Sequence, residues 1–321
     1  ASKRETSLQD TAMSISVLSG KDMEDRGVLS LRDIVSTVPG VNLANSQPGF
    51  SDYIMRGVAS GNISGGLGNR IITTYLDEFP LSFLSSDIGV VDIARVELLK
   101  GPQGTLYGKS AMGGVIRYIS NEPTTDGYEG GVNVYGSSTS SSGGNNYGGS
   151  GYLNIPIRDN LAARVVAYNF DNDGFIDADG ADQAEDVNTS ETTGGRIALK
   201  WDINKSTRLH LTYFNQEVKV GANQQITSTY TPDPLAVACP CPAPSDLQAP
   251  NRSTLTRQYA GEPSNFDAEM LNLKLDKEFE GFNLNVMAAR TDQTRHVTRV
   301  ANNFVGVTSL GRFFTSKDEF T

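Results

Sequence analysis

The sequence has 321 residues, of which 38% are hydrophobic and 20% are charged. This composition excludes a disordered tail and an all-helical coiled coil. No run approaches 18 apolar residues, which excludes a transmembrane helix. A net charge of −10 disfavours a grip on nucleic-acid phosphates, and two histidines, His210 and His296, leave little material for a histidine metal site. A membrane β-barrel stays open, because its alternating strands keep the mean hydropathy low.

Residues 1–124 have the pattern of a compact mixed α/β region. Ser-x-x-Asp sequences at 19–22 and 30–33 fit the capping pattern that opens helices. An apolar stripe at helical spacing follows the second of them and ends at Pro39-Gly40, so we expect a helix over 31–38. Strand-like runs follow at 53–58, 70–76, 95–99 and 113–120.

From about residue 128 the sequence alternates with period two. In the run 196–203, Ile197, Leu199 and Trp201 share one face, whereas Arg196 and Lys200 share the other. The same alternation predicts seven strands, at 130–136, 147–157, 161–170, 191–203, 207–218, 268–279 and 282–293. An eighth strand is expected to begin near Lys317.

The connections between these strands alternate in length. Three are short, at 158–160, 204–206 and 280–281, and the long polar ones are 137–146, 171–190, 219–267 and 294–316. Short turns at one end and long loops at the other are typical of outer-membrane barrels. Trp201, Phe279 and Phe282 lie beside short turns, where an aromatic girdle would sit. A soluble antiparallel sheet with one wet face also alternates and remains the competing interpretation.

The segment 95–123, RVELLKGPQGTLYGKSAMGGVIRYISNEP, resembles the end of the plug domain of TonB-dependent outer-membrane receptors. Upstream matches occur in the family's order: SLQD at 7–10, a Leu-Arg-Asp-Ile-Val segment ending in PGV over 31–41, IMRGV at 54–58 and YLDEFP at 75–80. DGFID at 173–177 and TTGGRIALKW at 192–201 extend the resemblance beyond the plug. One departure is Lys100, where the family commonly has Arg.

The resemblance implies a plug domain over 1–124 inside a transmembrane antiparallel β-barrel. Residues 125–321 would form the N-terminal portion of that barrel. The resemblance further implies a Gram-negative outer membrane, contact with lipid and lipopolysaccharide, and TonB with its inner-membrane motor proteins as partner. The implied function is energised uptake of a scarce bulky solute, most often a ferric siderophore, without enzymatic chemistry and without a required cofactor. Cobalamin, another metal chelate or an oligosaccharide remain alternative cargos. A soluble β-rich glycan-binding protein is the rival from another class.

The glycine-rich turn of that segment is expected to be structural. Gly101-Pro102 ends a strand, Gly104 and Gly108 flank Tyr107 and allow positive φ, and Gly113-Gly114 lets a strand pass close to other backbone. A phosphate-binding loop is excluded because Gln103 occupies the position of the first glycine that this motif requires. A nucleophile elbow fails because Met112 stands at its last glycine. We find no catalytic constellation in the sequence.

Substrate recognition is expected at the outward tip of the plug, together with barrel loops. The segment 59–69 offers polar groups at Asn62, Ser64 and Asn69, and the segment 79–89 offers apolar surface at Phe79, Leu81, Phe83 and Leu84. The alternative is that both are ordinary solvent-exposed connections. The resemblance also makes Arg56 and Lys100 the basic members of an ionic lock with barrel carboxylates beyond residue 321.

Two weaker expectations concern the long loops. Cys239 and Cys241, in the loop 219–267, are expected to be oxidised, with a mutual disulfide across Pro240 as one form, although the loop it closes would be small and strained. Free or externally paired thiols are the alternative. The acidic loop 171–190 suggests a calcium site at Asp171, Asp173, Asp177 and Asp179, because calcium takes hard oxygen ligands. Gly180 stands where the bidentate Glu of an EF-hand loop should be, so a solvated acidic loop is the alternative.

The strand count predicts that the barrel continues past this sequence. Plugged barrels typically have about 22 strands, whereas about eight are expected here. An open sheet in lipid would leave the N–H and C=O groups of its edges without partners. The family's TonB-binding box normally lies just before the segment matching residues 1–10, so it falls outside the sequence.

Overall fold

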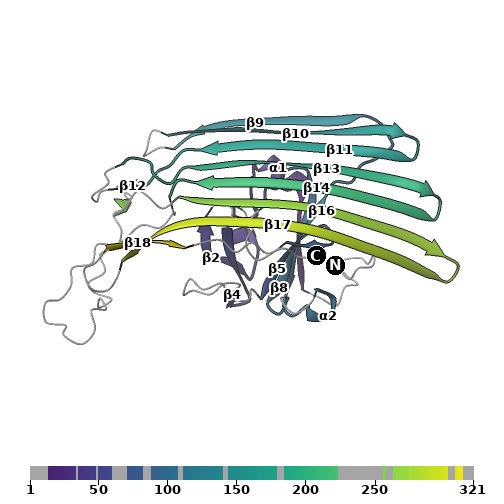
Figure 1. Cartoon of the computed structure of the whole chain (residues 1–321), viewed down its shortest axis with the longest axis horizontal. Helices are drawn as coiled ribbons and strands as arrows, with labels where there is room; N and C mark the ends of the chain where they lie inside the picture. The colour runs from purple at the N-terminus through teal and green to yellow at the C-terminus, as the bar shows by residue number, and fades with distance from the viewer. Residues whose placement is uncertain are drawn as a thin grey trace.

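The computed structural model describes residues 14–33, 35–47, 50–59, 71–81, 88–107, 111–139, 144–178, 184–222, 256–257, 263–302 and 308–313. It consists of an N-terminal plug of short strands and helices, and a long curved sheet that arches over it (Figure 1). No helix in these ranges is long and apolar enough to cross a membrane.

The plug is built on a five-stranded sheet with the order β1-β7-β8-β5-β6. Its strands are β1 (Ile15–Ser19), β5 (Ile72–Leu76), β6 (Phe79–Pro80), β7 (Ile93–Lys100) and β8 (Gly114–Ser120). Only β5 and β8 are parallel; the other neighbours are antiparallel. A second, three-stranded sheet joins β2 (Val41–Gln47), β3 (Phe50–Met55) and β4 (Val58–Ala59). Three of the four strands expected in this region are therefore present, as β5, β7 and β8, whereas the run expected at 53–58 is divided by a turn at Arg56-Gly57 into the end of β3 and the start of β4.

The helices of the plug are short. The first, α1 (Gly20–Asp25), starts where the capping pattern predicted, since the Ser19 hydroxyl accepts a hydrogen bond from the Asp22 N–H at 3.1 Å. The helix expected over 31–38 is instead two 3-10 turns, η1 (Leu31–Asp33) and η2 (Val35–Thr37). The Asp33 carboxylate accepts the N–H groups of Leu29 and Ser30, as the capping pattern predicted. The backbone bonds that follow join residues three apart, such as the Val38 N–H and the Val35 oxygen, so the segment forms 3-10 turns instead of an α-helix. A last helix, α2 (Gly104–Tyr107), follows β7.

The curved sheet, called the wall below, has eight antiparallel strands in the order β18-β17-β16-β14-β13-β11-β10-β9. They are β9 (Glu129–Ser138), β10 (Asn145–Arg158), β11 (Leu161–Asn172), β13 (Ser190–Asn204), β14 (Thr207–Val220), β16 (Ser264–Phe279), β17 (Phe282–Asn302) and β18 (Thr308–Phe313). Two bridging segments, β12 (Asp177–Ala178) and β15 (Thr256–Arg257), pair in parallel. Five of the seven predicted strands run only one or two residues further towards the long loops, β16 runs four and β17 nine residues further, and the eighth strand starts at Thr308 rather than near Lys317.

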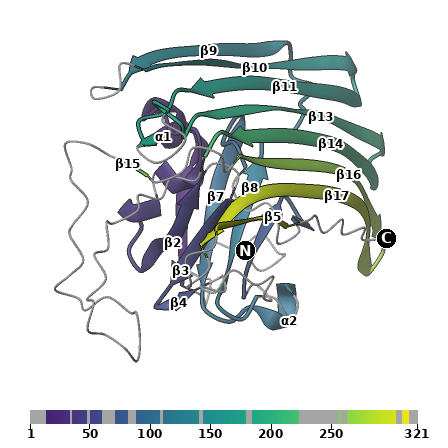
Figure 2. The same ribbon diagram turned by 60° about the vertical axis from the view of Figure 1, so that its left-hand side comes forward.

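The two faces of the wall have opposite character. Leu153, Ile197, Leu271 and their outward neighbours are exposed, whereas Arg164 and Asn272 on the facing side are buried. Exposed apolar residues outside and polar residues inside are the reverse of a soluble sheet, and they match a barrel strand. The wall curves around the plug in both views (Figures 1 and 2). The fold is thus a mixed α/β plug within part of an antiparallel β-barrel.

Plug and wall share a hydrophobic core. The largest buried cluster includes Met23, Val96 and Ile116 from the plug together with Phe214 and Met270 from the wall. Fully burying one such side chain contributes about 1.5–3 kcal/mol relative to leaving it in water. The wall residues of this cluster therefore stabilise the plug in its position.

Candidate functional site

A cavity of about 1450 Å³ lies between the plug and the inner face of β9 to β14. Its lining extends from Thr139 and Asn146, near the long loops, to Lys200 and Glu122 at the end with the short turns. Plug residues from α1 and from the segment 88–94 form the opposite side. The cavity therefore follows the wall along most of its height.

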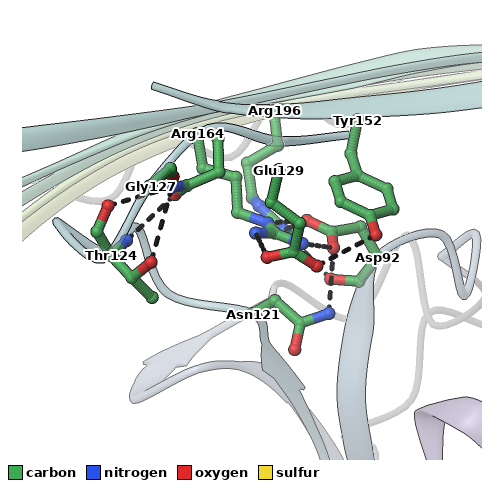
Figure 3. Close-up of polar contacts among 9 residues, drawn as sticks. Asp92, Asn121, Thr124, Gly127, Glu129, Tyr152, Arg164 and Arg196 are labelled. Atoms are coloured by element: carbon green, nitrogen blue, oxygen red, sulfur yellow. Dashed lines mark hydrogen bonds and ion pairs between the residues drawn. The ribbon is translucent and has the colours of Figure 1, made fainter. Parts of the chain in front are cut away.

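Asp92 is the centre of a buried ion cluster that bridges plug and wall (Figure 3). Its carboxylate accepts hydrogen bonds from Arg164 of β11, at 2.6 and 2.8 Å, and from Arg196 of β13, at 2.6 Å. The Asn121 amide of the plug donates a further bond at 2.9 Å. The Asp92 side chain is 1% exposed and both arginine side chains are 4% exposed. We call these four residues the Asp92 clamp.

The local fold explains how Asp92 reaches both arginines. It has a φ of +54° in the turn before β7, which directs the plug chain back towards the wall. Arg164 lies opposite Ala198 in the register of β11 and β13, so Arg196 is its diagonal neighbour on the same inward face. Two arginines on one carboxylate satisfy its lone pairs, which a buried charge requires.

The plug-to-barrel connection, residues 121–128 between β8 and β9, and the neighbouring wall residues make further contacts around the clamp. The Tyr152 ring lies 4.4 Å from the Arg164 guanidinium, and its hydroxyl donates to Glu129 at 3.1 Å. The fully buried Asn154 side chain accepts from the Thr124 N–H and donates to the carbonyl oxygens of Thr124 and Gly127. The connection is thus held to β10 directly beside the clamp (Figure 3).

Two further ion pairs join plug and wall, both with the acid on the plug. Glu78 accepts from Lys274 of β16 at 3.1 Å, and Glu122 accepts from Lys200 of β13 at 2.8 Å. Burial raises the pKa of Glu122, but the hydrogen bond and charge of Lys200 outweigh it, so the pKa is lowered below its ordinary value. The four ion pairs named here between plug and wall therefore all have an acidic plug residue and a basic wall residue.

Inside the plug, Glu97 and Arg117 form a buried pair at 2.8 Å between β7 and β8. Burial raises the pKa of Glu97, whereas Arg117 and a hydrogen bond from Arg95 lower it, and the net direction is down. Tyr107 of α2 packs edge-on against Tyr75, whose hydroxyl donates to the Tyr107 carbonyl oxygen. These contacts attach the predicted turn segment to the sheet.

The glycines of the turn segment have different local roles. Gly101 has a φ of +108°, in the region that favours glycine, and Pro102 follows it. A Cβ at Gly114 would lie 2.3 Å from the Met55 sulfur and 2.7 Å from the Leu99 oxygen, so backbone and side chain approach closely there. The approach at Gly113 is less close, because a Cβ there would lie 3.2 Å from the Ile71 oxygen. The expected positive φ at Gly104 is wrong, because this residue starts α2.

The proposed lock residues lie in the plug, away from any acidic side chain that the structure describes. Lys100 donates to the Ser16 hydroxyl at 2.8 Å and to the Pro39 oxygen at 2.9 Å, so it ties β7 to β1 and to the turn before β2. Arg56 is exposed and has a φ of +52° in the turn between β3 and β4. Their barrel partners were expected beyond residue 321, so the lock remains a prediction.

The residues expected at the plug tip are only partly described. Phe79 and Leu81 are 7% and 4% exposed and belong to the shared core, so they are not the exposed apolar surface that the sequence suggested. Their side chains turn inward because the tight β5–β6 hairpin pairs Leu76 with Phe79 over the core. Outside the described residues lie Asn62, Ser64, Asn69, Phe83, Leu84, Gly108, Asp179, Cys239 and Cys241.

Three of the four carboxylates suggested for calcium have local hydrogen bonds. Asp171 accepts from the Tyr147 hydroxyl, Asp173 from the Gly174 N–H, and Asp177 from the Asp186 N–H. Within the ranges that the structure describes, no group of three or more His, Cys, Asp or Glu residues is placed to hold a metal ion. The calcium site stays a prediction that depends on Asp179.

Sequence reasoning missed the Asp92 clamp. Its members are 72 and 104 residues apart along the chain, so no local motif contains them. The available signal was an arginine within the otherwise apolar run 161–168, because a charge on an inward strand position needs a partner.

A buried plug clamped to a curved wall with an apolar outer face defines a plug-and-barrel protein of the outer membrane. Residues 7–115 match the family model described as the TonB-dependent Receptor Plug Domain. The chain belongs to the TonB-dependent receptor family, which places it in the outer membrane of a Gram-negative bacterium.

Curated proteins that resemble this chain are named as receptors. The pesticin receptor of Yersinia pestis is 30% identical over 246 residues, which are 71% of this chain and 34% of that protein. The catecholate siderophore receptor Fiu of Escherichia coli O157:H7 is 28% identical over 266 residues, or 79% of this chain and 29% of that protein. The chain therefore spans about a third of the length of these curated relatives.

Solved structures show the same fold. The ferric yersiniabactin uptake receptor FyuA of Yersinia pestis aligns with a TM-score of 0.70 at 21% identity, covering 89% of this chain and 42% of that one. The ferripyoverdine receptor of Pseudomonas aeruginosa aligns with a TM-score of 0.73 at 17% identity, covering 93% and 37%. The expected plug within a barrel is confirmed.

Proposed function

We propose that the protein takes up a ferric siderophore across the outer membrane, with energy delivered through TonB and its inner-membrane motor proteins. The observation that carries the proposal is a plug held against the barrel wall by a few ion pairs, with a cavity of about 1450 Å³ beside them. Family membership supports the role, because the relatives are named as receptors for pesticin, a catecholate siderophore and ferrioxamine B.

The arrangement of contacts suits regulated opening. Ion pairs that are partly exposed contribute little, typically about 0–1 kcal/mol, so the Glu78 and Glu122 contacts are easily exchanged. The Asp92 clamp is buried, and removing one partner of such a cluster costs about 3–5 kcal/mol. Opening a path therefore requires work on the plug, which is the part that TonB would supply in this proposal.

The test is uptake of labelled iron chelates by a deletion strain that carries the full-length protein. We expect uptake of at least one siderophore class, dependent on both this protein and TonB. Cobalamin, another metal chelate and an oligosaccharide are assayed in parallel, because the named relatives differ in cargo. Uptake of only one of these solutes, without any ferric siderophore, would contradict the proposed cargo and keep the transporter class.

A further inference from the structure

The inner face of the wall has a row of basic side chains near the short turns. Lys200 on β13 lies directly opposite His210 on β14, which lies directly opposite Lys274 on β16. Directly opposed side chains on neighbouring strands have Cβ atoms about 4.5–5.5 Å apart. We call these three residues the basic row.

The basic row faces the plug, and plug carboxylates occupy it. Glu122 accepts from Lys200 at 2.8 Å, and Glu78 accepts from Lys274 at 3.1 Å. Asp276, on the same strand as Lys274, lies farther from it, at 3.6 Å. The two lysines lie two strands apart on one face, on either side of His210, and the plug carboxylates neutralise both of them.

Asn272 adds a second, independent observation. It is the next inward residue of β16 before Lys274, and it is 2% exposed. Neither its amide nitrogen nor its amide oxygen has a hydrogen-bond partner in the described part of the chain. A buried amide without partners costs about 1–3 kcal/mol. Such a group, two positions before Lys274 on the same face of β16, can donate to an anion and accept from a hydroxyl.

We propose that the basic row, with Asn272, is a transit site for an anionic solute, for which Glu78 and Glu122 are the resting occupants. The plug carboxylates stand in for carboxylate or phenolate groups of a metal chelate. When the plug moves, its carboxylates leave together, and the uncompensated row binds the solute on its way inward. The cavity along the wall reaches the row, because Lys200 and Glu122 line its end. The proposal rests on the proposed transport function and specifies the charge of its substrate at this point.

Binding is tested without any transport assay. The double variant Glu78→Gln/Glu122→Gln of the full-length protein in detergent removes the resting occupants and leaves the row free. Citrate, a small tricarboxylate, should raise its thermal midpoint in a concentration-dependent way, since a ligand that binds only the folded state stabilises it. The quadruple variant that also carries Lys200→Gln and Lys274→Gln should show no citrate effect. Equal citrate responses in the two variants, or none in the double variant, overturn the proposal.

Transport then separates a transit site from a simple tether. A tether predicts that Lys200→Gln/Lys274→Gln and Glu78→Gln/Glu122→Gln behave alike, because each breaks the same two ion pairs. A transit site predicts that the lysine variant takes up an anionic ferric chelate about fivefold more slowly at unchanged external affinity, as expected for a partly exposed charge contact of about 1 kcal/mol. The glutamate variant keeps or exceeds the normal rate. Equal slowing in both variants overturns the proposal.

The two proposals fail differently. If the wild-type protein transports no ferric chelate, the proposed function fails, while the citrate response still reports whether the row binds carboxylates. If chelates are transported and citrate has no effect on the double variant, only the transit site fails.

Discussion

The side-chain oxygen of Gln216 on β14 accepts a hydrogen bond from the Gly89 N–H of the plug at 2.9 Å, across 127 positions of sequence. The same oxygen accepts the Tyr168 hydroxyl of β11 at 2.8 Å. Gly89 lies against the Tyr168 ring, where an added Cβ would be 3.3 Å away. One wall amide therefore fixes both a plug backbone group and a neighbouring wall side chain.

Replacing this amide is expected to loosen the plug. Gln216→Leu leaves the Gly89 N–H and the buried Tyr168 hydroxyl without this acceptor, and each such loss costs about 1–3 kcal/mol. We expect faster proteolysis of the plug and a lower thermal midpoint. The control is Asn215→Leu, on the adjacent outward position of β14, which should leave both readouts unchanged. Equal behaviour of the two variants would show that the Gln216 contact does not hold the plug.

The Asp92 clamp should be the most sensitive contact between plug and wall. Asp92→Asn removes the charge that compensates Arg164 and Arg196, and breaking a buried pair costs about 3–5 kcal/mol. We expect lower stability of the docked plug and a higher rate of hydrogen exchange in β7 and β8, measured by mass spectrometry. Asp126→Asn, at an exposed position of the same plug-to-barrel connection, is the matched control. Normal exchange rates in Asp92→Asn would refute the role given to the clamp.

Gly114 tests close packing within the plug. Gly114→Ala would bring a methyl group within 2.3 Å of the Met55 sulfur and 2.7 Å of the Leu99 oxygen. Overpacking of this kind typically costs about 1–3 kcal/mol. Gly127→Ala, where a Cβ meets no atom within 4 Å, should be neutral by comparison. Urea denaturation of both variants measures the difference, and a neutral Gly114→Ala would contradict the packing seen around Met55.

Glu97 is expected to make the plug sensitive to acid. Its pKa in the folded protein lies below the ordinary value of 4.5, so the unfolded chain binds the proton more readily. The stabilisation from this carboxylate is therefore complete above about pH 4.5 and is lost as the pH falls through the lower folded value. Glu97→Gln should flatten the decline of the thermal midpoint below pH 4.5. An unchanged decline of the thermal midpoint would assign the acid sensitivity to other carboxylates. Glu122 is one candidate, because its pKa is also lowered.

The sequence predicted the architecture better than the interface. Period-two alternation located the strands because Arg196 and Ile197 face opposite environments, a local property of one strand. The segment 31–38 was mispredicted because its apolar residues Leu31, Val35 and Val38 are buried by two 3-10 turns just as an α-helix would bury them, so their spacing does not separate the two forms.

The motifs did not reveal that the plug contributes the acidic residue, and the wall the basic residue, to these ion pairs. Lys100 stands on a motif strand and was expected to reach a wall carboxylate, but its described partners are neutral oxygen atoms within the plug. The acidic plug residues that do reach the wall, such as Asp92 and Glu78, depend on which strands lie opposite them. That information exists only once the tertiary arrangement is known.

The Asp92 clamp spans fewer residues of sequence than the Glu78–Lys274 contact, which has a consequence for the order of assembly. Arg164 and Arg196 follow Asp92 by 72 and 104 residues, so both are synthesised before β14, β16 and β17. Contacts of lower sequence separation carry a smaller loop-closure cost and form earlier. We expect the plug to dock on β11 and β13 through the clamp before Glu78 reaches Lys274 of β16, which follows it by 196 residues. The nascent sheet would then grow around a template that already fixes its curvature.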